Sequence, residues 1–211
     1  TNNSVLFAED GESFYFTTTL GDNGESLTSG LAFEHRVRRV DASSGQLLAD
    51  ADLSRQESSG GVALTPHQLS LFDDALWVVA EGSNDILKLD AETLEELTRA
   101  EATGLPRDIM ATASGVVVHG GNDYLLHTFD LDAEFQSSTS IGTDPRTEEE
   151  ALGQKLFFGP GDTFATNYAC NSCHADARGD TRVWQAGPME VHEVSRLSLI
   201  HISEPTRPLH I

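Results

Sequence analysis

A repeat with a period near 40 residues runs through the first two thirds of the chain and constrains its fold more than any other feature. Prolines mark the spacing at Pro66, Pro106 and Pro145. After each of the first two, the chain reads as an apolar strand, a turn rich in Gly, Asn and Asp, and a second strand that ends in an aspartate. Short strands and turn clusters at such a period are typical of β-propeller blades, which bury their faces by stacking on their neighbours.

The repeat is present in three copies, each with two recognisable strands. The expected strands cover residues 13–16 and 37–41, 75–80 and 86–90, and 115–119 and 126–130. In every copy the positions one and four before the closing aspartate are apolar. An antiparallel sandwich is the main alternative, but it does not require a 40-residue recurrence. We therefore predict a mainly β segment over residues 1–144, a partial propeller of about three blades.

These repeats resemble the seven-bladed propellers that are built from Tyr-Val-Thr-Asn (YVTN) type repeats. The resemblance covers residues 1–144 and rests on the period more than on any single motif. Three blades do not close a ring, so we expect the native protein to extend upstream of Thr1.

A second feature, near residue 170, carries the chemistry that the sequence predicts. Cys170-Asn171-Ser172-Cys173-His174 has the Cys-x-x-Cys-His pattern of c-type haem attachment. The two thiols can add to the two vinyl groups of one porphyrin, because two intervening residues place both on one helical turn. His174 follows directly and can offer its imidazole nitrogen to the iron as the proximal axial ligand. We predict one covalent haem c, held by Cys170 and Cys173, in this chain.

Three other interpretations of the two cysteines were weighed. A thioredoxin-like redox pair opens a helix inside a βαβ unit, and no such unit precedes Cys170. A structural zinc site needs four ligands at fixed spacing, whereas the chain has 2 cysteines and the next histidine after the motif is His192. A structural disulfide between Cys170 and Cys173 stays open as an alternative.

The segment between the repeats and the haem motif is predicted to begin with a helix. Thr147 and Glu150 have the spacing of a capping box, and the acidic residues of this first turn suit the helix dipole. Apolar residues at 151, 152 and 156 continue an amphipathic pattern, which ends at the Phe-Phe-Gly-Pro-Gly run of residues 157–161.

Residues 151–158 read Ala-Leu-Gly-Gln-Lys-Leu-Phe-Phe, and Cys-x-x-Cys-His follows about a dozen residues later. This arrangement resembles the first haem domain of bacterial di-haem cytochrome c peroxidases, and equally that of the related methylamine-utilisation di-haem enzymes. Propellers fused ahead of such domains occur in that superfamily. The resemblance covers about residues 147–196, so we expect the N-terminal part of an α-helical c-type cytochrome domain over residues 145–196.

The resemblance implies an exported, periplasmic protein with a second haem domain downstream. Peroxide or substrate chemistry and electron input would be divided between two irons, and the partner would be a redox protein or a small oxidant such as peroxide. No second Cys-x-x-Cys-His occurs in the chain, so enzymatic activity of this chain alone is in doubt. A non-enzymatic mono-haem electron carrier, with the propeller as a docking module, is the alternative.

Residues after the motif are candidates for completing the haem site. Arg178 and Arg182 could pair with haem propionates, because Arg forms bidentate bonds to carboxylates; solvent-exposed charge is the equal alternative. The sixth iron ligand could be Met189, which would give a His/Met iron, or His192, although a lone Met more often fills a core. Trp184 is expected to contribute buried hydrophobic area rather than to relay electrons.

The net charge and the hydropathy of the chain exclude some classes of partner. A formal net charge of −21 argues against nucleic acid or an anionic membrane as a partner. No apolar run is long enough to span a bilayer.

The histidines of the repeats are expected to be ordinary strand and loop residues; they are His35, His67, His119 and His127. The sequence shows no nucleophile–base arrangement.

The last residues of the chain do not read as part of a fold. Residues 197–207, Leu-Ser-Leu-Ile-His-Ile-Ser-Glu-Pro-Thr-Arg, match the conceptual translation of a transposon-end adapter used in preparing sequencing libraries. We therefore treat residues 197–211 as a non-native tail and exclude His201 and His210 as iron ligands.

Overall fold

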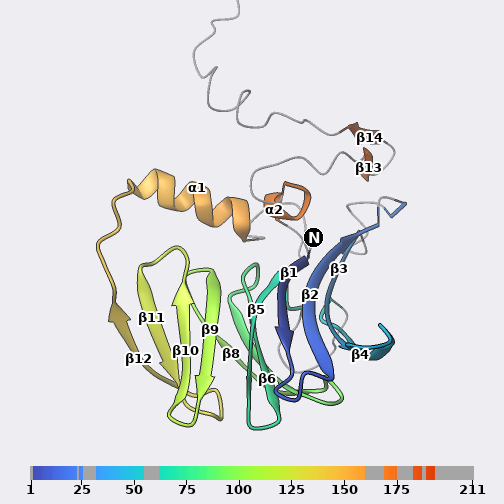
Figure 1. Cartoon of the computed structure of the whole chain (residues 1–211). Coiled ribbons are helices and arrows are strands. Elements are labelled where there is room, and N and C mark those ends of the chain that lie inside the picture. The colour runs from blue at the N-terminus through green and yellow to red at the C-terminus, as the bar shows by residue number, and fades with distance from the viewer. Residues whose placement is uncertain are drawn as a thin grey trace, which may run out of the picture.

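The computed structural model describes residues 2–22, 24–25, 32–54, 62–159, 169–174, 183–186 and 189–192. Most of these residues form three four-stranded antiparallel sheets, and in each sheet the strands pair in chain order (Figure 1). Three consecutive four-stranded meanders are the architecture of β-propeller blades. The chain is therefore mainly β and forms a partial propeller, and we number its sheets blade 1 to blade 3.

The strands of the three blades have the following bounds. Blade 1 contains β1 (Asn2–Phe7), β2 (Ser13–Gly21), β3 (Phe33–Asp41) and β4 (Leu47–Asp52). Blade 2 contains β5 (Pro66–Phe72), β6 (Ala75–Ala80), β7 (Asp85–Asp90) and β8 (Glu96–Glu101). Blade 3 contains β9 (Pro106–Thr112), β10 (Gly115–Gly120), β11 (Leu125–Phe129) and β12 (Phe135–Ser140).

The strands predicted from the repeat are confirmed as the two middle strands of each blade. The first and last strands were not predicted. Pro66 and Pro106 each open a first strand, a position that proline tolerates because it lacks only the amide hydrogen at the strand's start. The last strands are largely exposed: β12 is exposed at every position, and β4 and β8 have one buried residue between them. An outer edge strand of this kind carries no alternating pattern for sequence reasoning to find.

The blades stack on one another and bury two apolar cores. The first strands of successive blades contact each other, as do β6 and β9. One core lies between blades 1 and 2 and includes Tyr15, Val37, Leu76 and Leu87. The second lies between blades 2 and 3 and is built around Trp77, with Ile86, Val116, Val118 and Phe129 among its members. Neighbouring residues of β6, such as Leu76 and Trp77, thus belong to opposite cores, as the period of two in a β-strand requires.

The aspartate that closes each repeat has a structural task in the turn that follows. Oδ1 of Asp41 accepts hydrogen bonds from the amides of Ser43 and Ser44. Oδ1 of Asp90 accepts them from the amides of Glu92 and Thr93, and Asp130 repeats the arrangement. A carboxylate that satisfies turn amides in this way favours the turn over continued strand. This explains why the aspartate recurs with the period of the blades.

In the described residues after blade 3, the polypeptide forms two helices and a two-stranded hairpin. Helix α1 (Glu148–Phe158) runs across one end of the blades, and the single-turn helix α2 (Cys170–Cys173) lies beside it (Figure 1). Strands β13 (Val183–Ala186) and β14 (Met189–His192) pair as an antiparallel hairpin. The α-helical cytochrome domain expected over 145–196 is represented in the described residues by these elements alone, and the rest of that expectation stays a prediction. No helix in the described part of the chain is long and apolar enough to cross a membrane.

Candidate functional site

The two cysteines of the Cys-x-x-Cys-His motif begin and end the same helical turn. Cys170 is exposed, Cys173 is half-buried, and neither forms a disulfide. The amide of His174 donates to the carbonyl oxygen of Cys170 at 3.0 Å, which closes the turn. At its start, the Ser172 hydroxyl oxygen accepts from the amide of Ala169 at 3.1 Å, and the Ser172 amide donates to the Ala169 carbonyl at 3.0 Å. These two hydrogen bonds between Ser172 and Ala169 stabilise the start of the turn, where the side chain of Ala169 cannot act as a cap.

The turn of α2 is seated on the propeller rather than projecting from it. It contacts α1 and strand β2. Cys173 packs against Ala32 and Phe33 at the start of β3, both of which are almost fully buried. Ala169, just before the turn, is 5% exposed. The Cys173 side of the motif is therefore covered by blade 1, while Cys170 is exposed.

Helix α1 begins as the sequence predicts. Oγ1 of Thr147 accepts from the amide of Glu150 at 3.2 Å, and a carboxylate oxygen of Glu150 accepts from the amide of Thr147 at 2.8 Å. The predicted capping box is thus confirmed. The apolar residues Leu152 and Leu156 are 55% and 41% exposed. The amphipathic pattern therefore does not bury them against the blades.

Two arginines, at equivalent positions of the repeat, fasten α1 to the blades. Arg107 follows Pro106; its guanidinium lies 5.3 Å from the ring centre of Phe158, and its Nε is 2.9 Å from the buried carboxylate of Glu81. A side chain on Gly121 would approach Cγ of Arg107 to 2.7 Å, so glycine is needed there for the arginine to pass. This contact holds the C-terminal end of α1.

Arg146 follows Pro145 and holds the other end of α1. It donates to the side chain of Asn122, to that of Gln154 on α1, and to Asp144 in the linker. Hydrogen bonds from Arg146 hold the pKa of the Asp144 carboxyl below its usual value. Its guanidinium also lies 5.5 Å from the ring centre of Tyr124. One side chain thus joins blade 3, the linker and the helix.

The donor set of α2 fits a covalently bound haem. Two thiols outside any disulfide stand at the ends of one turn, and an imidazole follows at the next residue. This is the set that c-type haem attachment requires. By contrast, no group of three or more His, Cys, Asp and Glu side chains that could hold a metal ion occurs in the described part of the chain.

The remaining predicted haem residues are only partly placed. Arg178 and Arg182 lie outside the described residues. Met189 and His192 are the first and last residues of β14, opposite Ala186 and Val183 of β13. Trp184 lies on β13, opposite Val191. Whether any of them approaches the haem motif stays a prediction.

One arrangement of polar side chains was missed by sequence reasoning. The Ser138 hydroxyl lies 2.8 Å from Nδ1 of His127, and Nε2 of His127 lies 2.9 Å from a carboxylate oxygen of Asp123. Ser138 and His127 are directly opposite on β12 and β11, so the period of the strands brings them together. His127 is 3% exposed and faces the core beside Phe129. We assign this chain of hydrogen bonds to holding the polar strand β12 on its blade.

A cavity of about 940 Å³ lies at the end of the blades away from α1. It is lined by turn residues of blades 1 and 2, most of them acidic, and by Tyr15 and Arg39. The Tyr15 hydroxyl donates to the carbonyl oxygen of Ala91 at 2.9 Å, which ties the two blades together, and burial raises the pKa of this phenol. The cavity is thus an acidic groove among three turns of blades 1 and 2, remote from α2.

Comparisons with known proteins find the fold alone. No protein-family model matches the chain, and no curated protein matches it. Among solved structures it is similar to BamB from Moraxella catarrhalis, at 17% identity over 66% of this chain and 37% of that chain, with a TM-score of 0.44. It is also similar to a streptogramin B lyase, at 18% identity over 67% and 41%, with a TM-score of 0.46. The chain thus spans about two fifths of the length of these proteins.

Proposed function

We propose that this chain carries a covalent haem c on Cys170 and Cys173, with His174 as the proximal ligand of the iron. The observation that carries the proposal is the turn of α2, which presents both thiols and is followed at once by the imidazole. Haem, when bound, supplies a redox-active iron whose potential depends on its axial ligands and on its burial. The biochemical role is then haem-based redox chemistry.

The chain's own residues supply anchoring and orientation. The hydrogen bonds between Ser172 and Ala169 set the start of the turn, and the Cys173 side is packed on Phe33. Because α2 also contacts α1, which Arg107 and Arg146 fasten to the blades, the propeller acts as a rigid base for the haem-binding turn. We propose that the parent protein is an exported oxidoreductase of the di-haem cytochrome c peroxidase type, with YVTN-type blades as this base.

The test is covalent attachment. The chain is co-expressed with a c-type haem maturation system, and the purified protein is denatured and assayed for haem that stays with the polypeptide. Retained haem with the spectrum of two thioether bonds is expected for the natural sequence and for Asn171→Ala, which leaves both thiols in place. Cys170→Ala combined with Cys173→Ala is expected to retain none. A natural chain that loses all of its haem on denaturation contradicts the proposal.

The alternative is a mono-haem electron carrier, in which the propeller serves as a docking module for the redox partner. The two roles differ at the sixth position of the iron. A peroxidase-type iron leaves this position open to small ligands, whereas a His/Met carrier fills it. A ferric spectrum that shifts on addition of cyanide supports the peroxidase type for this haem. A low-spin spectrum that cyanide leaves unchanged supports the carrier.

A further inference from the structure

Three side chains of blade 3 form one continuous chain of hydrogen bonds from a hydroxyl through an imidazole to a carboxylate. The Ser138 hydroxyl lies 2.8 Å from Nδ1 of His127, and Nε2 of His127 lies 2.9 Å from Oδ2 of Asp123. These bonds hold β12 on its blade. They also place a nucleophile, a base and an acid in the order that serine hydrolases use.

The carboxylate decides which nitrogen of His127 is the base. As a carboxylate, Asp123 can only accept hydrogen bonds, so Nε2 of the imidazole carries the ring proton and donates it to Asp123. Nδ1 then carries no proton and accepts from the Ser138 hydroxyl. The hydroxyl of Ser138 therefore donates to a nitrogen that can take its proton.

The backbone around Asp123 is shaped to hold its carboxylate. Oδ1 of Asp123 accepts from the amide of Leu125 at 3.0 Å. A side chain on Gly104 or on Gly120 would overlap this carboxylate, so both positions need glycine. The side chain of His127 is 4% exposed. The acid and the base are thus held by packing and by hydrogen bonds, as a preorganised catalytic pair requires.

Ser138, by contrast, lies at the surface of the molecule. It belongs to β12, whose 6 residues are all exposed. This strand is also the edge strand of blade 3. A molecule in solution can therefore reach the hydroxyl of Ser138, while the imidazole that would activate it is buried behind it.

The register of β12 supplies a donor for negative charge that develops at this hydroxyl. The amide of Ile141 donates to the carbonyl oxygen of Tyr124 at 2.9 Å, and bonded and non-bonded pairs alternate along an antiparallel ladder. The pair of His127 and Ser138 is therefore a non-bonded one, and the Ser138 amide points away from β11. At the edge of the sheet, this N–H can donate to the carbonyl oxygen of a bound ester, as the donors of an oxyanion hole do.

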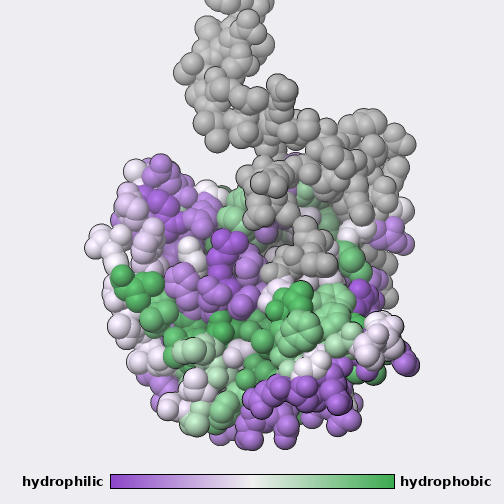
Figure 2. Space-filling model, viewed as in Figure 1, coloured by the Kyte–Doolittle hydropathy of each residue, from purple (hydrophilic) through white to green (hydrophobic). Residues whose placement is uncertain are grey.

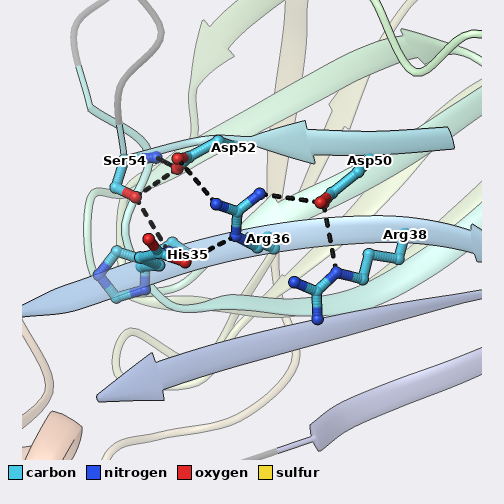
Figure 3. Close-up of polar contacts among 7 residues, drawn as sticks. His35, Arg36, Arg38, Asp50, Asp52 and Ser54 are labelled. Atoms are coloured by element: carbon cyan, nitrogen blue, oxygen red, sulfur yellow. Dashed lines mark hydrogen bonds and ion pairs between the residues drawn. The ribbon is translucent and has the colours of Figure 1, made fainter. Parts of the chain in front are cut away.

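Blade 1 contains the same three residue types without this order (Figure 3). The Ser54 hydroxyl donates to Asp52 at 2.5 Å and accepts from the backbone amide of His35 at 3.1 Å, not from its ring. Nδ1 of His35 instead lies 3.2 Å from the amide nitrogen of Thr65, and Asp52 also pairs with Arg36. The serine of blade 1 is therefore not aimed at an imidazole, and the relay is specific to blade 3.

An exposed aromatic ring lies next to the base. Phe135 is 57% exposed, and its ring centre lies 6.5 Å from that of His127 and 5.7 Å from that of Phe129. The space-filling view shows hydrophobic residues at the surface over blade 3 (Figure 2). This ring offers an apolar contact to the acyl group of a molecule bound at Ser138, which favours a substrate with an apolar acyl chain.

We propose that Ser138, His127 and Asp123 form a hydrolytic site for carboxylic esters with a short apolar acyl group. Oγ of Ser138 bonds to the ester carbonyl carbon, and its proton passes to Nδ1 of His127. The bond from this carbon to the alcohol oxygen breaks, and the alcohol leaves with that proton. Water then attacks the acyl-Ser138 ester and gives a proton to Nδ1, which returns it to Ser138 as the carboxylic acid is released.

The first test is covalent labelling of the full chain by a fluorophosphonate, located by peptide mass spectrometry. Oγ of Ser138 bonds to the phosphorus, and fluoride leaves with the proton. We expect the label on Ser138 and none on Ser54. Ser138→Ala should abolish the label, and His127→Gln should slow labelling at least ~100-fold. Ser137→Ala is the matched control, since its hydroxyl lies 2.8 Å from that of Thr128 and not from an imidazole.

The second test is hydrolysis of p-nitrophenyl acetate and p-nitrophenyl butyrate. Asp123 is a positioning residue, so Asp123→Asn should lower kcat at least ~10-fold and leave KM nearly unchanged, because it alters the tautomer of the imidazole and not the surface that the ester contacts. Phe135→Ala should raise KM for the butyrate several-fold more than for the acetate. Circular dichroism checks that every variant is folded.

The outcomes separate a hydrolytic site from a purely structural set of bonds. A natural chain that takes no label on Ser138 overturns the proposal. A label that His127→Gln leaves unchanged also overturns it, because Ser138 is then only an exposed hydroxyl. If His127→Gln does not fold, Asp123→Asn decides, and an unchanged kcat overturns the proposal. None of these results depends on haem, because the chain is labelled and assayed without it.

Discussion

Arg146 and Asn122 join the helix before the haem motif to blade 3. Nη1 of Arg146 donates to Oδ1 of Asn122 at 2.6 Å, and Nη2 donates to the Asn122 carbonyl oxygen at 2.9 Å. The side-chain amide of Asn122 in turn reaches the carbonyl of Ala151 on α1 at 3.5 Å. A turn of the blade and the first turns of the helix are therefore held by one guanidinium and one amide.

We predict that Arg146→Ala loosens α1 from the blades without unfolding them. The linker loses the bonds that Arg146 makes to Asn122, Asp144 and Gln154, so the segment after β12 should open more often. The measurement is limited proteolysis, in which cleavage between β12 and α1 should become several-fold faster. Arg38→Ala, which removes an arginine from blade 1, should leave that cleavage rate unchanged. Equal rates for Arg146→Ala and the natural chain would show that other contacts hold the helix.

Trp77 is the side chain on which the contact between blades 2 and 3 most depends. It is 0% exposed within the second core. We predict that Trp77→Ala lowers the free energy of unfolding by about 3–5 kcal/mol, because it removes buried area and leaves a cavity. Urea unfolding followed by circular dichroism measures the change. Leu97→Ala, at an exposed apolar residue, should change it by no more than about 0.5 kcal/mol.

A second substitution at the same position separates packing from hydrogen bonding. Nε1 of Trp77 is buried and has no hydrogen-bond partner among the described residues. Trp77→Phe removes this donor together with part of the ring, so it should cost less than Trp77→Ala. If the two variants are equally unstable, the indole nitrogen of Trp77 makes a stabilising hydrogen bond in the folded protein.

The sequence predicts the blades well because their signal is periodic. The middle strands of blade 2 place neighbouring residues in different cores, and the aspartates Asp41, Asp90 and Asp130 recur because each satisfies the amides of a turn. The last strands were missed because one like β12 is exposed throughout, so it carries no hydrophobic alternation. The hydrogen bond between Ser138 and His127 was missed because strand register, which single residues do not encode, brings the pair together.

The sequence predicted only those parts of the candidate site that depend on residues close together in the chain. The Thr147–Glu150 capping box and the turn of Cys170–Cys173 depend on residues at most four apart, and the structure has both. The roles of Arg107 and Arg146 in fastening α1 depend on contacts between distant segments. Pro106 and Pro145 are visible in the sequence as repeat markers, but nothing in the pattern indicates that the arginine after each proline contacts a helix outside the repeat.

Acid should weaken the turns that the repeated aspartates hold. Hydrogen bonds from Ser44, and next from Ser43, lower the pKa of Asp41 to about 2, and the amide of Thr93 lowers the pKa of Asp90. A carboxyl whose pKa is lower in the folded state stabilises the fold above its unfolded pKa, which is about 4, and loses that effect as pH falls through the folded pKa. The contribution of Asp41 should therefore disappear between about pH 4 and pH 2.

The measurement is the urea midpoint of the natural chain and of Asp41→Asn at a series of pH values. The variant keeps an oxygen that can accept from the turn amides but lacks the charge. We expect the natural chain to be the more stable at pH 6 and the difference to shrink below about pH 4. A difference that is constant with pH would assign the effect of Asp41 to geometry instead of charge.

His35 is predicted to stabilise the contact between blades 1 and 2 through its ring. Nδ1 of the fully buried imidazole lies 3.2 Å from the amide nitrogen of Thr65. A backbone N–H can only donate, so Nδ1 accepts and carries no proton. His35→Ala leaves this buried amide without its acceptor and should lower the free energy of unfolding by about 1–3 kcal/mol. His119→Ala, at a half-buried histidine of β10, is the control, and equal losses for the two would contradict the assignment.

His174 and the two cysteines are predicted to have separable roles in the haem site. The thioether bonds depend on Cys170 and Cys173, whereas the imidazole of His174 provides an axial ligand. In a chain matured with haem, His174→Ala should therefore retain covalent haem after denaturation. Its iron should change spin state and should bind added imidazole, which can replace the lost ligand. Optical spectra of the ferric and ferrous protein, with and without added imidazole, measure this. Asn171→Ala keeps all three attachment groups and should match the natural spectrum. Unchanged spectra for His174→Ala would show that another residue supplies the proximal ligand.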